Sequence, residues 1–249
     1  MSKTVLVTGA TAGFGESIAY KFAKDGNKLI ITGRRKDRLE KVAKEIESLG
    51  GTSLALCFDV RNQNDVIEAI KSIPAEYRAI DILVNNAGLA SGLDPIQEGN
   101  TEDWDKMIDT NVKGLLYVSN EVIPLLKDGS SQIINIGSTA GKEVYPRGNV
   151  YCASKHAVDA ISKGMRLDLL PRGIKVTQIS PGAANTEFST VRFHGDKERA
   201  DSLYTDYNPL LAEDIAELAY YSANLPAHVC INDLVVTSLA QANSYVFYK

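Results

Sequence analysis

Short apolar runs alternate along the chain with longer segments of mixed polarity. The runs are rich in β-branched residues and almost continuously apolar, which is typical of strands buried on both faces of a sheet. Predicted strands span residues 3–8, 28–32, 54–58, 81–84, 132–136, 175–180 and 231–236. The alternation predicts an α/β fold with a single-domain, doubly wound parallel sheet (a Rossmann fold), about seven strands and helices on both faces.

The segments between these runs carry apolar residues at helical spacing, as Leu39, Val42 and Ile46 do. Further predicted helices cover 62–72, 101–110, 111–126, 151–170 and 212–223. Residues 183–208 are instead polar and irregular. Because they follow the carboxyl end of the sixth strand, we expect a substrate-binding lid there. The tail, ending in Tyr-Val-Phe-Tyr-Lys, is too apolar for a free end and should dock on its own fold or on a neighbouring subunit.

Composition narrows the function classes. The chain has 249 residues, 44% of them hydrophobic, and a net charge of −4, which argues against a dedicated nucleic-acid binder. No apolar run approaches membrane-spanning length and no signal segment opens the chain, so we expect a cytoplasmic protein. Three widely spaced cysteines suit a reducing compartment. The three histidines lack metal-ligand spacing, so no metal site is predicted.

The first strand runs into a glycine-rich turn that opens a helix. In this strand–turn–helix context, Gly9 permits the tight turn, Gly13 lets a pyrophosphate approach the backbone, and Gly15 allows close packing of helix on strand. The helix N-terminus then presents unpaired N–H groups to phosphates. Thr11 and Phe14 belong to the same predicted cofactor-binding turn, although such turns also serve purely structural ends.

The second strand ends in Gly33-Arg34-Arg35, where a dinucleotide-binding fold chooses its cofactor. An acidic residue there would accept bonds from a ribose 2′-hydroxyl, but none occurs before Asp37. Guanidinium groups suit the oxygens of a 2′-phosphate, so the sequence predicts NADP(H). We expect Arg34 to matter more than Arg35. Simple solvent exposure of one arginine is the alternative.

Two other strand ends supply further predicted cofactor contacts. Asp59 and Val60 follow the third strand, where they could bond an adenine amino group. After the fourth strand, a ribose passing over the turn would need small or amide side chains, and these are Asn86, Ala87 and Gly88. Asn85, at the start of this turn, could equally brace the loop.

The candidate proton-transfer group comprises Ser138, Tyr151 and Lys155. Four positions apart in one helix, Tyr151 and Lys155 would share a face. A phenol has a pKa of about 10, and an ammonium beside it with a cationic nicotinamide nearby would lower that pKa. Lowering it by roughly three units would take about 4 kcal/mol. The pair alone is weak evidence for catalysis, since a surface lysine lying along a half-buried tyrosine gives the same sequence pattern. The motifs upstream of it favour the catalytic interpretation.

Asn111 lies inside a helical stretch although asparagine is a poor helix former. Either a kink tolerates it, or its amide and a freed carbonyl hold a water in a proton relay.

Taken together, TGATAGFG, Asp59-Val60, NNAG, Asn111, Ser138, YCASK and Pro181-Gly182 resemble the classical type of the short-chain dehydrogenase/reductase family. The resemblance covers nearly the whole chain and implies hydride transfer between a nicotinamide and a carbonyl or alcohol carbon. It further implies that Tyr151 acts as acid/base, that Lys155 lowers its pKa and holds the nicotinamide ribose, and that Ser138 binds the substrate oxygen. Asn111 would order the relay water. Pro181 and Gly182 would line the cofactor, and Thr186 would contact the nicotinamide carboxamide.

Within the family, NNAGLASGLDP, NIGSTAG, NVYCASK, TEFSTVRFHGD and LPAHVCIN are similar to the NADP-dependent 3-hydroxy acid dehydrogenases. That similarity implies serine, allo-threonine, 3-hydroxyisobutyrate or 3-hydroxypropionate as substrates, reduction of malonic semialdehyde, and a cytoplasmic homotetramer. A carboxylate substrate needs a cationic partner near the tyrosine. Arg192 in the lid is our hypothesis and Arg147 the reserve, with a surface salt bridge as the alternative for either.

Two other functions fit parts of the pattern. One is reduction of another carbonyl class, such as a 3-oxoacyl thioester or a sugar. The other is a non-catalytic NADP-binding sensor or scaffold, which would not need the proton-transfer residues.

Overall fold

The computed structural model describes residues 2–248 and contains one seven-stranded parallel sheet. The strands lie in the order β3-β2-β1-β4-β5-β6-β7. Their bounds are β1 Thr4–Val7, β2 Lys28–Gly33, β3 Thr52–Cys57, β4 Ile82–Asn85, β5 Gln132–Ile136, β6 Lys175–Pro181 and β7 Asp233–Val236. The predicted doubly wound sheet is therefore confirmed.

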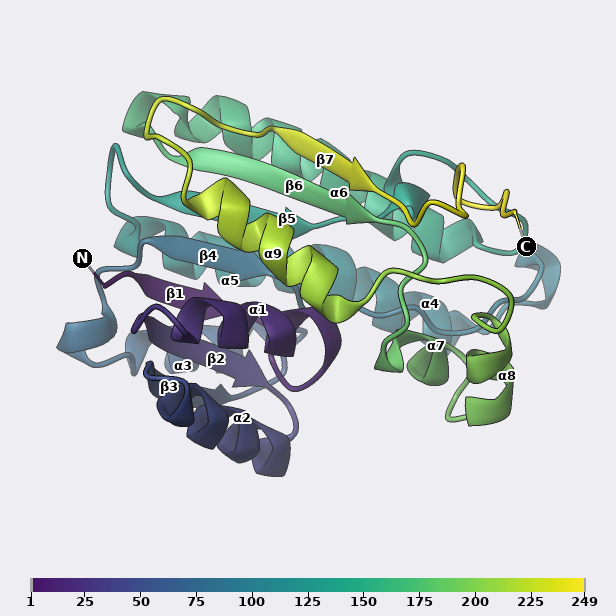
Figure 1. The fold of residues 1–249 in the computed structure, drawn as a ribbon, viewed down its shortest axis with the longest axis horizontal. Helices are drawn as coiled ribbons and strands as arrows, with labels where there is room; N and C mark the ends of the chain where they lie inside the picture. The colour runs from purple at the N-terminus through teal and green to yellow at the C-terminus, as the bar shows by residue number, and fades with distance from the viewer. Residues whose placement is uncertain (1, 249) are drawn as a thin grey trace.

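Helices cover both faces of this sheet (Figure 1). The main helices are α1 Gly13–Ala23, α2 Lys36–Ser48, α3 Gln63–Lys71, α4 Thr101–Ile108, α5 Leu115–Val122, α6 Asn149–Leu169 and α9 Ala212–Ala223. Helices α1, α2 and α9 pack on one face, and α3, α5 and α6 pack on the other. Alternation along β1 supplies both cores, because Val5 and Val7 point to the first face and Leu6 to the second.

The strand order reverses between β1 and β4. From β1 the chain builds outward through β2 and β3, and then crosses to β4 on the other side of β1. In open parallel sheets, ligands bind in the crevice that this reversal leaves at the carboxyl ends of the strands. The glycine turn after β1 and the turn after β4 both reach this crevice.

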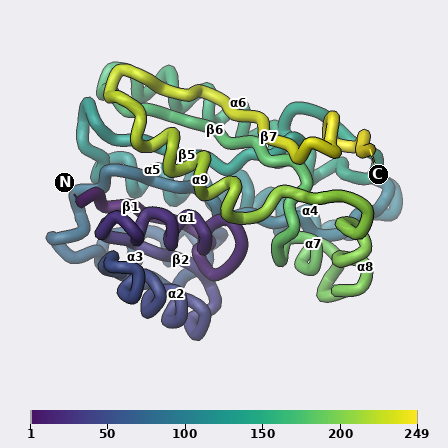
Figure 2. Tube along the Cα trace, in the orientation of Figure 1, coloured from purple at the N-terminus to yellow at the C-terminus, as the bar shows by residue number. Residues whose placement is uncertain are grey.

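The segment 183–208 is more ordered than its composition suggests. It contains two short helices, α7 Glu187–Arg192 and α8 Lys197–Ser202, so the expectation of irregular backbone was wrong. Both begin at side-chain caps: the Thr186 hydroxyl accepts from Phe188 N, and the Asp196 carboxylate accepts from Arg199 N. Figure 2 shows this segment beyond the carboxyl ends of the strands, on the same side as the chain end.

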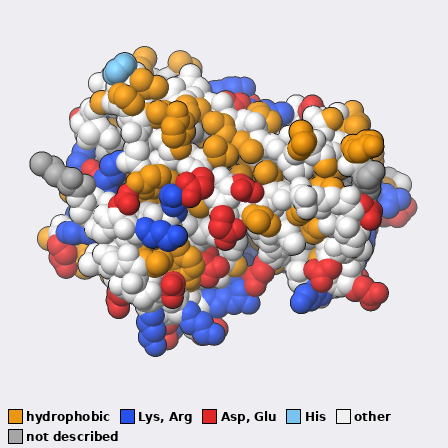
Figure 3. All heavy atoms as spheres, viewed as in Figure 1, with side chains coloured by type: hydrophobic (Ala, Val, Ile, Leu, Met, Phe, Trp, Pro, Cys, Tyr) orange, Lys and Arg blue, Asp and Glu red, His pale blue; other side chains and the backbone are white. Residues whose placement is uncertain are grey.

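The end of the chain docks partly on its own fold. Gln241, Ser244 and Phe247 line the cavity beneath it, and the Phe247 ring lies 5.2 Å from that of Tyr207. Leu239 and Tyr248 remain exposed. Figure 3 shows hydrophobic side chains gathered around β7 and the tail, with mixed charges over the opposite half of this view.

Between residues 2 and 248, no helix is long and apolar enough to cross a membrane. Nor does this part of the chain bring three His, Cys, Asp or Glu side chains together as a metal site.

Candidate active site

The glycine turn needs glycine where the backbone makes its closest approaches. Gly9 has a φ of +66°, and a Cβ there would lie 2.9 Å from the Cα of Ala87. A Cβ on Gly15 would lie 2.5 Å from the carbonyl oxygen of Gly9, closer than real Cβ contacts. The turn after β1, the start of α1 and the turn after β4 are therefore locked together without room for a methyl group.

A crevice of about 290 Å³ runs from this turn to the candidate proton-transfer group. It gathers predicted cofactor residues from four strand ends, helix α6 and the segment 183–208: Gly9, Thr11, Gly13, Phe14, Arg34, Arg35, Asp59, Val60, Asn86, Ala87, Gly88, Tyr151, Lys155 and Thr186. Gly15 packs behind the turn, and Pro181 and Gly182 line a neighbouring cavity instead. Residues far apart in sequence thus meet at the carboxyl ends of the strands, where open parallel sheets bind dinucleotides.

Two arginines flank the outer end of the crevice, where β2 ends. Arg35 donates to the Thr11 hydroxyl at 2.9 Å and to the Glu187 carboxylate at 3.0 Å. The Arg34 guanidinium is half-exposed, 3.6 Å from the Asp59 carboxylate. Burial acts to raise the pKa of Asp59, but hydrogen bonds from Arg61 and the charge of Arg34 outweigh it and hold that pKa below its usual value. This end of the crevice therefore offers two guanidinium groups, which suit the oxygens of a 2′-phosphate, and each of them faces a carboxylate of the chain.

Sequence reasoning missed the acidic partner of these arginines. Glu187, at the start of α7, bonds Arg35 and also Arg38, so it ties the segment 183–208 to the edge of the crevice. A pair separated by 152 positions leaves no local pattern that would reveal it.

The turn after β4 is braced by two asparagines. The Asn86 amide donates to the carbonyl oxygens of Thr8 at 2.9 Å and Gly9 at 3.1 Å. Asn85 is buried and donates to Ser119 and Asn135, each at 2.9 Å. Asn85 is therefore the loop brace considered from the sequence, while Asn86 fixes the glycine turn at the crevice floor.

Tyr151 and Lys155 lie one turn apart near the start of α6 and face the same crevice, as predicted. Tyr151 is 8% exposed, and the Ser138 side chain hydrogen-bonds its phenol. The Lys155 ammonium donates to the carbonyl oxygen of Ile136 at 2.9 Å. Burial lowers the pKa of Lys155 to about 8. Tyr151 lines both this crevice and the neighbouring cavity, whereas Lys155 lines only the crevice and Ser138 only the cavity.

The lowered pKa expected for Tyr151 assumes a nicotinamide nearby, and the chain without one does not produce it. Burial raises the pKa of its phenol, and the neighbouring Tyr145 adds to the increase. The hydrogen bond from Ser138 and the charge of Arg192 act in the opposite direction but are outweighed. The Lys155 ammonium donates a hydrogen bond to the Ile136 carbonyl oxygen, and burial lowers its own pKa. Further positive charge, such as that of a nicotinamide ring, is therefore needed to lower the pKa of the phenol.

Asn111 lies in a π-helix, Asp109–Gly114, between α4 and α5. Its side-chain oxygen accepts from Leu89 N at 2.8 Å, and its amide donates to Leu89 O at 2.8 Å and Ser154 Oγ at 3.0 Å. The kink predicted for this asparagine is thus a π turn, a feature often found at functional sites. Its amide fixes the loop beside Lys155, and the relay water stays a prediction.

A second cavity, of about 370 Å³, opens from Ser138 and Tyr151 toward the lid and the tail. Seven aromatic residues line it together with polar residues that include Arg192 and Gln241. Arg192 hydrogen-bonds the Tyr145 hydroxyl, and its guanidinium carbon lies 5.2 Å from the centre of the Tyr151 ring. Its Nε is buried and has no hydrogen-bond partner among the described residues.

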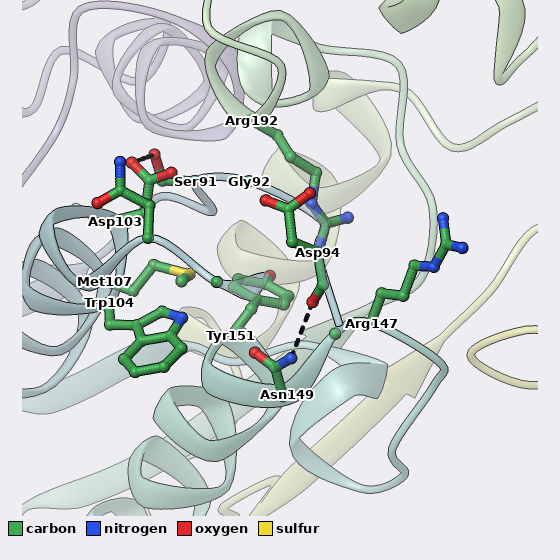
Figure 4. Close-up of a pocket in the computed structure, with 13 residues that line it drawn as sticks. Ser91, Gly92, Asp94, Asp103, Trp104, Met107, Arg147, Asn149, Tyr151 and Arg192 are labelled. Carbon is green, nitrogen blue, oxygen red and sulfur yellow. Dashed lines mark hydrogen bonds between the residues drawn. The ribbon is translucent and has the colours of Figure 1, made fainter. Parts of the chain in front are cut away.

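A small pocket on the other side of Tyr151 shows where both predicted arginines point (Figure 4). The Arg192 guanidinium extends toward Tyr151, whereas the exposed Arg147 side chain extends away from it. The two candidates for a carboxylate partner are therefore not equivalent, and of the two it is Arg192 that lies against the Tyr151 ring.

Comparison with known proteins places the chain in a family. The model of the short chain dehydrogenase family matches residues 3–197. An NADP-dependent 3-hydroxy acid dehydrogenase of Salmonella typhi is 48% identical over 96% of both chains. Sulfoacetaldehyde reductase 2 of Chromohalobacter salexigens is 46% identical over 97% of this chain and 96% of its own.

Serine 3-dehydrogenase of Agrobacterium fabrum is 42% identical over 97% of this chain and 96% of its own. Among solved structures, the closed form of a serine dehydrogenase complexed with NADP+ superposes with a TM-score of 0.91. It is 45% identical, and the match covers 98% of each chain. The chain belongs to the short-chain dehydrogenase family.

Proposed function

We propose that this protein is an NADP(H)-dependent oxidoreductase that interconverts 3-hydroxy acids and the corresponding carbonyl acids, with Tyr151 as the acid/base. One observation carries the proposal: the nucleotide crevice and a cavity lined by Arg192 meet at Tyr151, with Lys155 on the crevice side and Ser138 on the cavity side. Serine, allo-threonine and 3-hydroxypropionate are the substrates to expect, with malonic semialdehyde in the reducing direction.

The cofactor assignment rests on the outer end of the crevice. The end of β2 offers Arg34 and Arg35 and no carboxylate for a ribose 2′-hydroxyl, so a 2′-phosphate fits better. Relatives that are named as NADP-dependent or solved with NADP+ support the same choice. When bound, the nicotinamide supplies or accepts the hydride.

The inner end of the crevice handles the proton. Ser138 and Tyr151 both present hydroxyl groups to the cavity where a substrate oxygen would sit. In reduction, the Tyr151 phenol donates its proton to the carbonyl oxygen as hydride reaches the carbon. In oxidation, the tyrosine accepts the hydroxyl proton. Burial lowers the pKa of Lys155 to about 8, which is close to neutral pH. The amine can therefore lose and regain a proton there, and so help to restore the proton of the tyrosine.

Arg192 is the proposed partner of the substrate's acid group. Its buried Nε has a free donor, and its guanidinium lies beside the phenol that would act on a carbon two bonds away from the acid group. A guanidinium binds carboxylates and sulfonates alike, so the sulfoacetaldehyde reductase relative makes a sulfonated aldehyde the second candidate substrate.

The mechanism is tested by Tyr151→Phe. This variant should still bind NADPH, measured by fluorescence titration, while turnover falls by two or more orders of magnitude, about the contribution of general acid–base catalysis. Unchanged turnover would remove Tyr151 from the chemistry. A chain that binds NADPH but turns over none of the panel below, even as wild type, would instead be a sensor or scaffold.

Substrate class is tested by Arg192→Met. The KM for a 3-hydroxy acid should rise while a neutral alcohol of the same length is spared, and a panel should include sulfoacetaldehyde, 3-oxoacyl thioesters and sugars. Equal losses on charged and neutral substrates would dispose of the anion site. A rise in KM that occurs in Arg147→Met and not in Arg192→Met would place the anion site at Arg147 instead.

We further propose a cytoplasmic homotetramer. Large apolar side chains stay exposed at the end of α6, just after it and in the tail, among them Leu167, Leu170, Leu239 and Tyr248, which is typical of surfaces that subunits cover. The three cysteines are free, as a reducing compartment allows. Light scattering on the purified protein measures the subunit number directly.

A further inference from the structure

The end of α7 that carries Arg192 is fastened to the opposite wall of the site at two points. The backbone carbonyl of Arg192 accepts from Gly92 N at 3.0 Å, in the loop after β4. Two residues later, the His194 Nε2 atom lies 3.2 Å from the Asp103 carboxylate of α4. An isolated helix of six residues is far too short to be stable on its own, so contacts of this kind must hold α7 in place.

Asp103 is unusual because its carboxylate is buried, with only 6% of the side chain exposed. The Ser91 hydroxyl donates to Oδ1 at 2.6 Å, and the Lys106 ammonium lies 3.5 Å from the same atom. The other oxygen, Oδ2, faces His194. A buried carboxylate is costly unless its oxygens are paired. The imidazole therefore closes the one side of Asp103 that Ser91 and Lys106 leave open.

The backbone of His194 points to the same conclusion. Its φ of +53° lies in the left-handed region, where a residue with a Cβ costs roughly 1–2 kcal/mol more than glycine. Helices usually end with glycine at such a position. Compared with glycine, His194 adds only a methylene group and the imidazole ring. The contact of that ring with Asp103 is therefore what the histidine contributes at this position.

We propose that Asp103 and His194 are positioning residues that hold the Arg192 guanidinium against Tyr151 and so set the preference for anionic substrates. The inference rests on the proposed role of Arg192 as anion partner. Neither residue lines the cavity proposed for the substrate, although Asp103 lines the small pocket beside Tyr151. It fixes the turn immediately after Arg192, and through that turn the direction in which the guanidinium points.

The decisive variant is His194→Gly, which removes the imidazole and also relieves the left-handed strain. Thermal stability should stay the same or rise. The KM for a 3-hydroxy acid should increase roughly three- to tenfold, since a partly exposed pair with one buried partner contributes about that factor. The kcat for a neutral alcohol should not change. A merely structural role predicts the opposite: KM would follow stability and stay constant when stability does.

Two further variants complete the experiment. Asp103→Asn keeps the shape and the acceptor for Ser91, and should raise the same KM without affecting the neutral alcohol. His228→Gly, at an exposed histidine on the turn before β7, is the matched control. It should leave the KM for the acid and the kcat for the neutral alcohol unchanged.

A double variant separates this inference from the proposed function. If Arg192→Met raises the KM for the acid and His194→Gly adds nothing in that background, the two residues act through one contact and the inference stands. If Arg192→Met raises the KM but His194→Gly alone does not, or if the effects multiply, the positioning role is overturned while the anion site survives. An unchanged KM in Arg192→Met would overturn the anion site itself, and the positioning role with it.

Discussion

Lys155 is predicted to make the protein less stable than it would be with an apolar side chain there. The residue is 6% exposed, and burial lowers the pKa of its ammonium from the ordinary 10.5 to about 8. Each unit of pKa corresponds to about 1.4 kcal/mol, so at pH 7 the buried charge costs about 3 kcal/mol of the free energy of unfolding. Lys155→Met removes this charge at nearly constant side-chain length.

The substitution also removes a hydrogen bond. The carbonyl of Ile136, which accepts from the ammonium at 2.9 Å, would lose its partner at a cost of about 1–2 kcal/mol. The balance is a gain of about 1–2 kcal/mol at pH 7 in the variant, together with loss of turnover. Such a gain would show that the lysine is retained for chemistry at the expense of stability.

The pH dependence gives the sharper test. Below about pH 8 the folded and unfolded states both carry the proton, so the full penalty applies. Between about 8 and 10.5 the unfolded state binds more protons, and wild-type stability rises with pH relative to the variant. The advantage of Lys155→Met should therefore be largest at pH 7 and shrink by pH 9.5.

Urea denaturation followed through the single tryptophan, Trp104, measures this at both pH values. Lys163→Met is the control, because this lysine lies on the same helix but is 63% exposed. Its effect should stay within about 1 kcal/mol. A Lys155→Met variant that is less stable at pH 7 by an amount that does not vary with pH would refute the reasoning.

Three other predictions concern the crevice. Arg34→Ala should weaken NADPH far more than NADH in fluorescence titrations, because only NADPH has the 2′-phosphate; equal weakening would contradict the assignment. Gly15→Ala, whose Cβ would lie 2.5 Å from a carbonyl oxygen, should lose nucleotide binding and several kcal/mol of stability. Gly164→Ala, with nothing within 4 Å, should instead stabilise by about 1 kcal/mol in the same thermal melts. Glu187→Gln should speed NADPH release in stopped-flow displacement, since it loosens the lid from two arginines; an unchanged rate argues against that link.

The parts of the fold that the sequence predicts well are those set by local pattern. The run at residues 132–136 is the observed β5, and the helix predicted for 212–223 is the observed α9. Apolar periodicity and glycine-rich turns act within a few residues, so they can be read along the chain. The same holds for Tyr151 and Lys155, because one helical turn fixes their relation.

The parts it misses depend on contacts between distant segments. Nothing in the sequence near Asp103 indicates that His194, 91 positions further on, will face it. In the same way, nothing near Glu187 indicates that it will bond Arg35. The rise in the pKa of Tyr151 likewise comes first from burial, which only the assembled site produces. Spacing pointed to the candidate reacting groups, but the balance of charges around them is a property of the packed structure.

Helix α7 joins the two halves of the proposed reaction. Its first residue, Glu187, bonds the arginines at the cofactor end, and its last, Arg192, lies against Tyr151 at the substrate end. At 1.5 Å per residue it is only about 9 Å long, and a helix this short moves as one piece. We therefore expect a shift at either end to be passed to the other. Cofactor preference and substrate preference should then depend on each other, so the substrate panel should be measured with each nicotinamide.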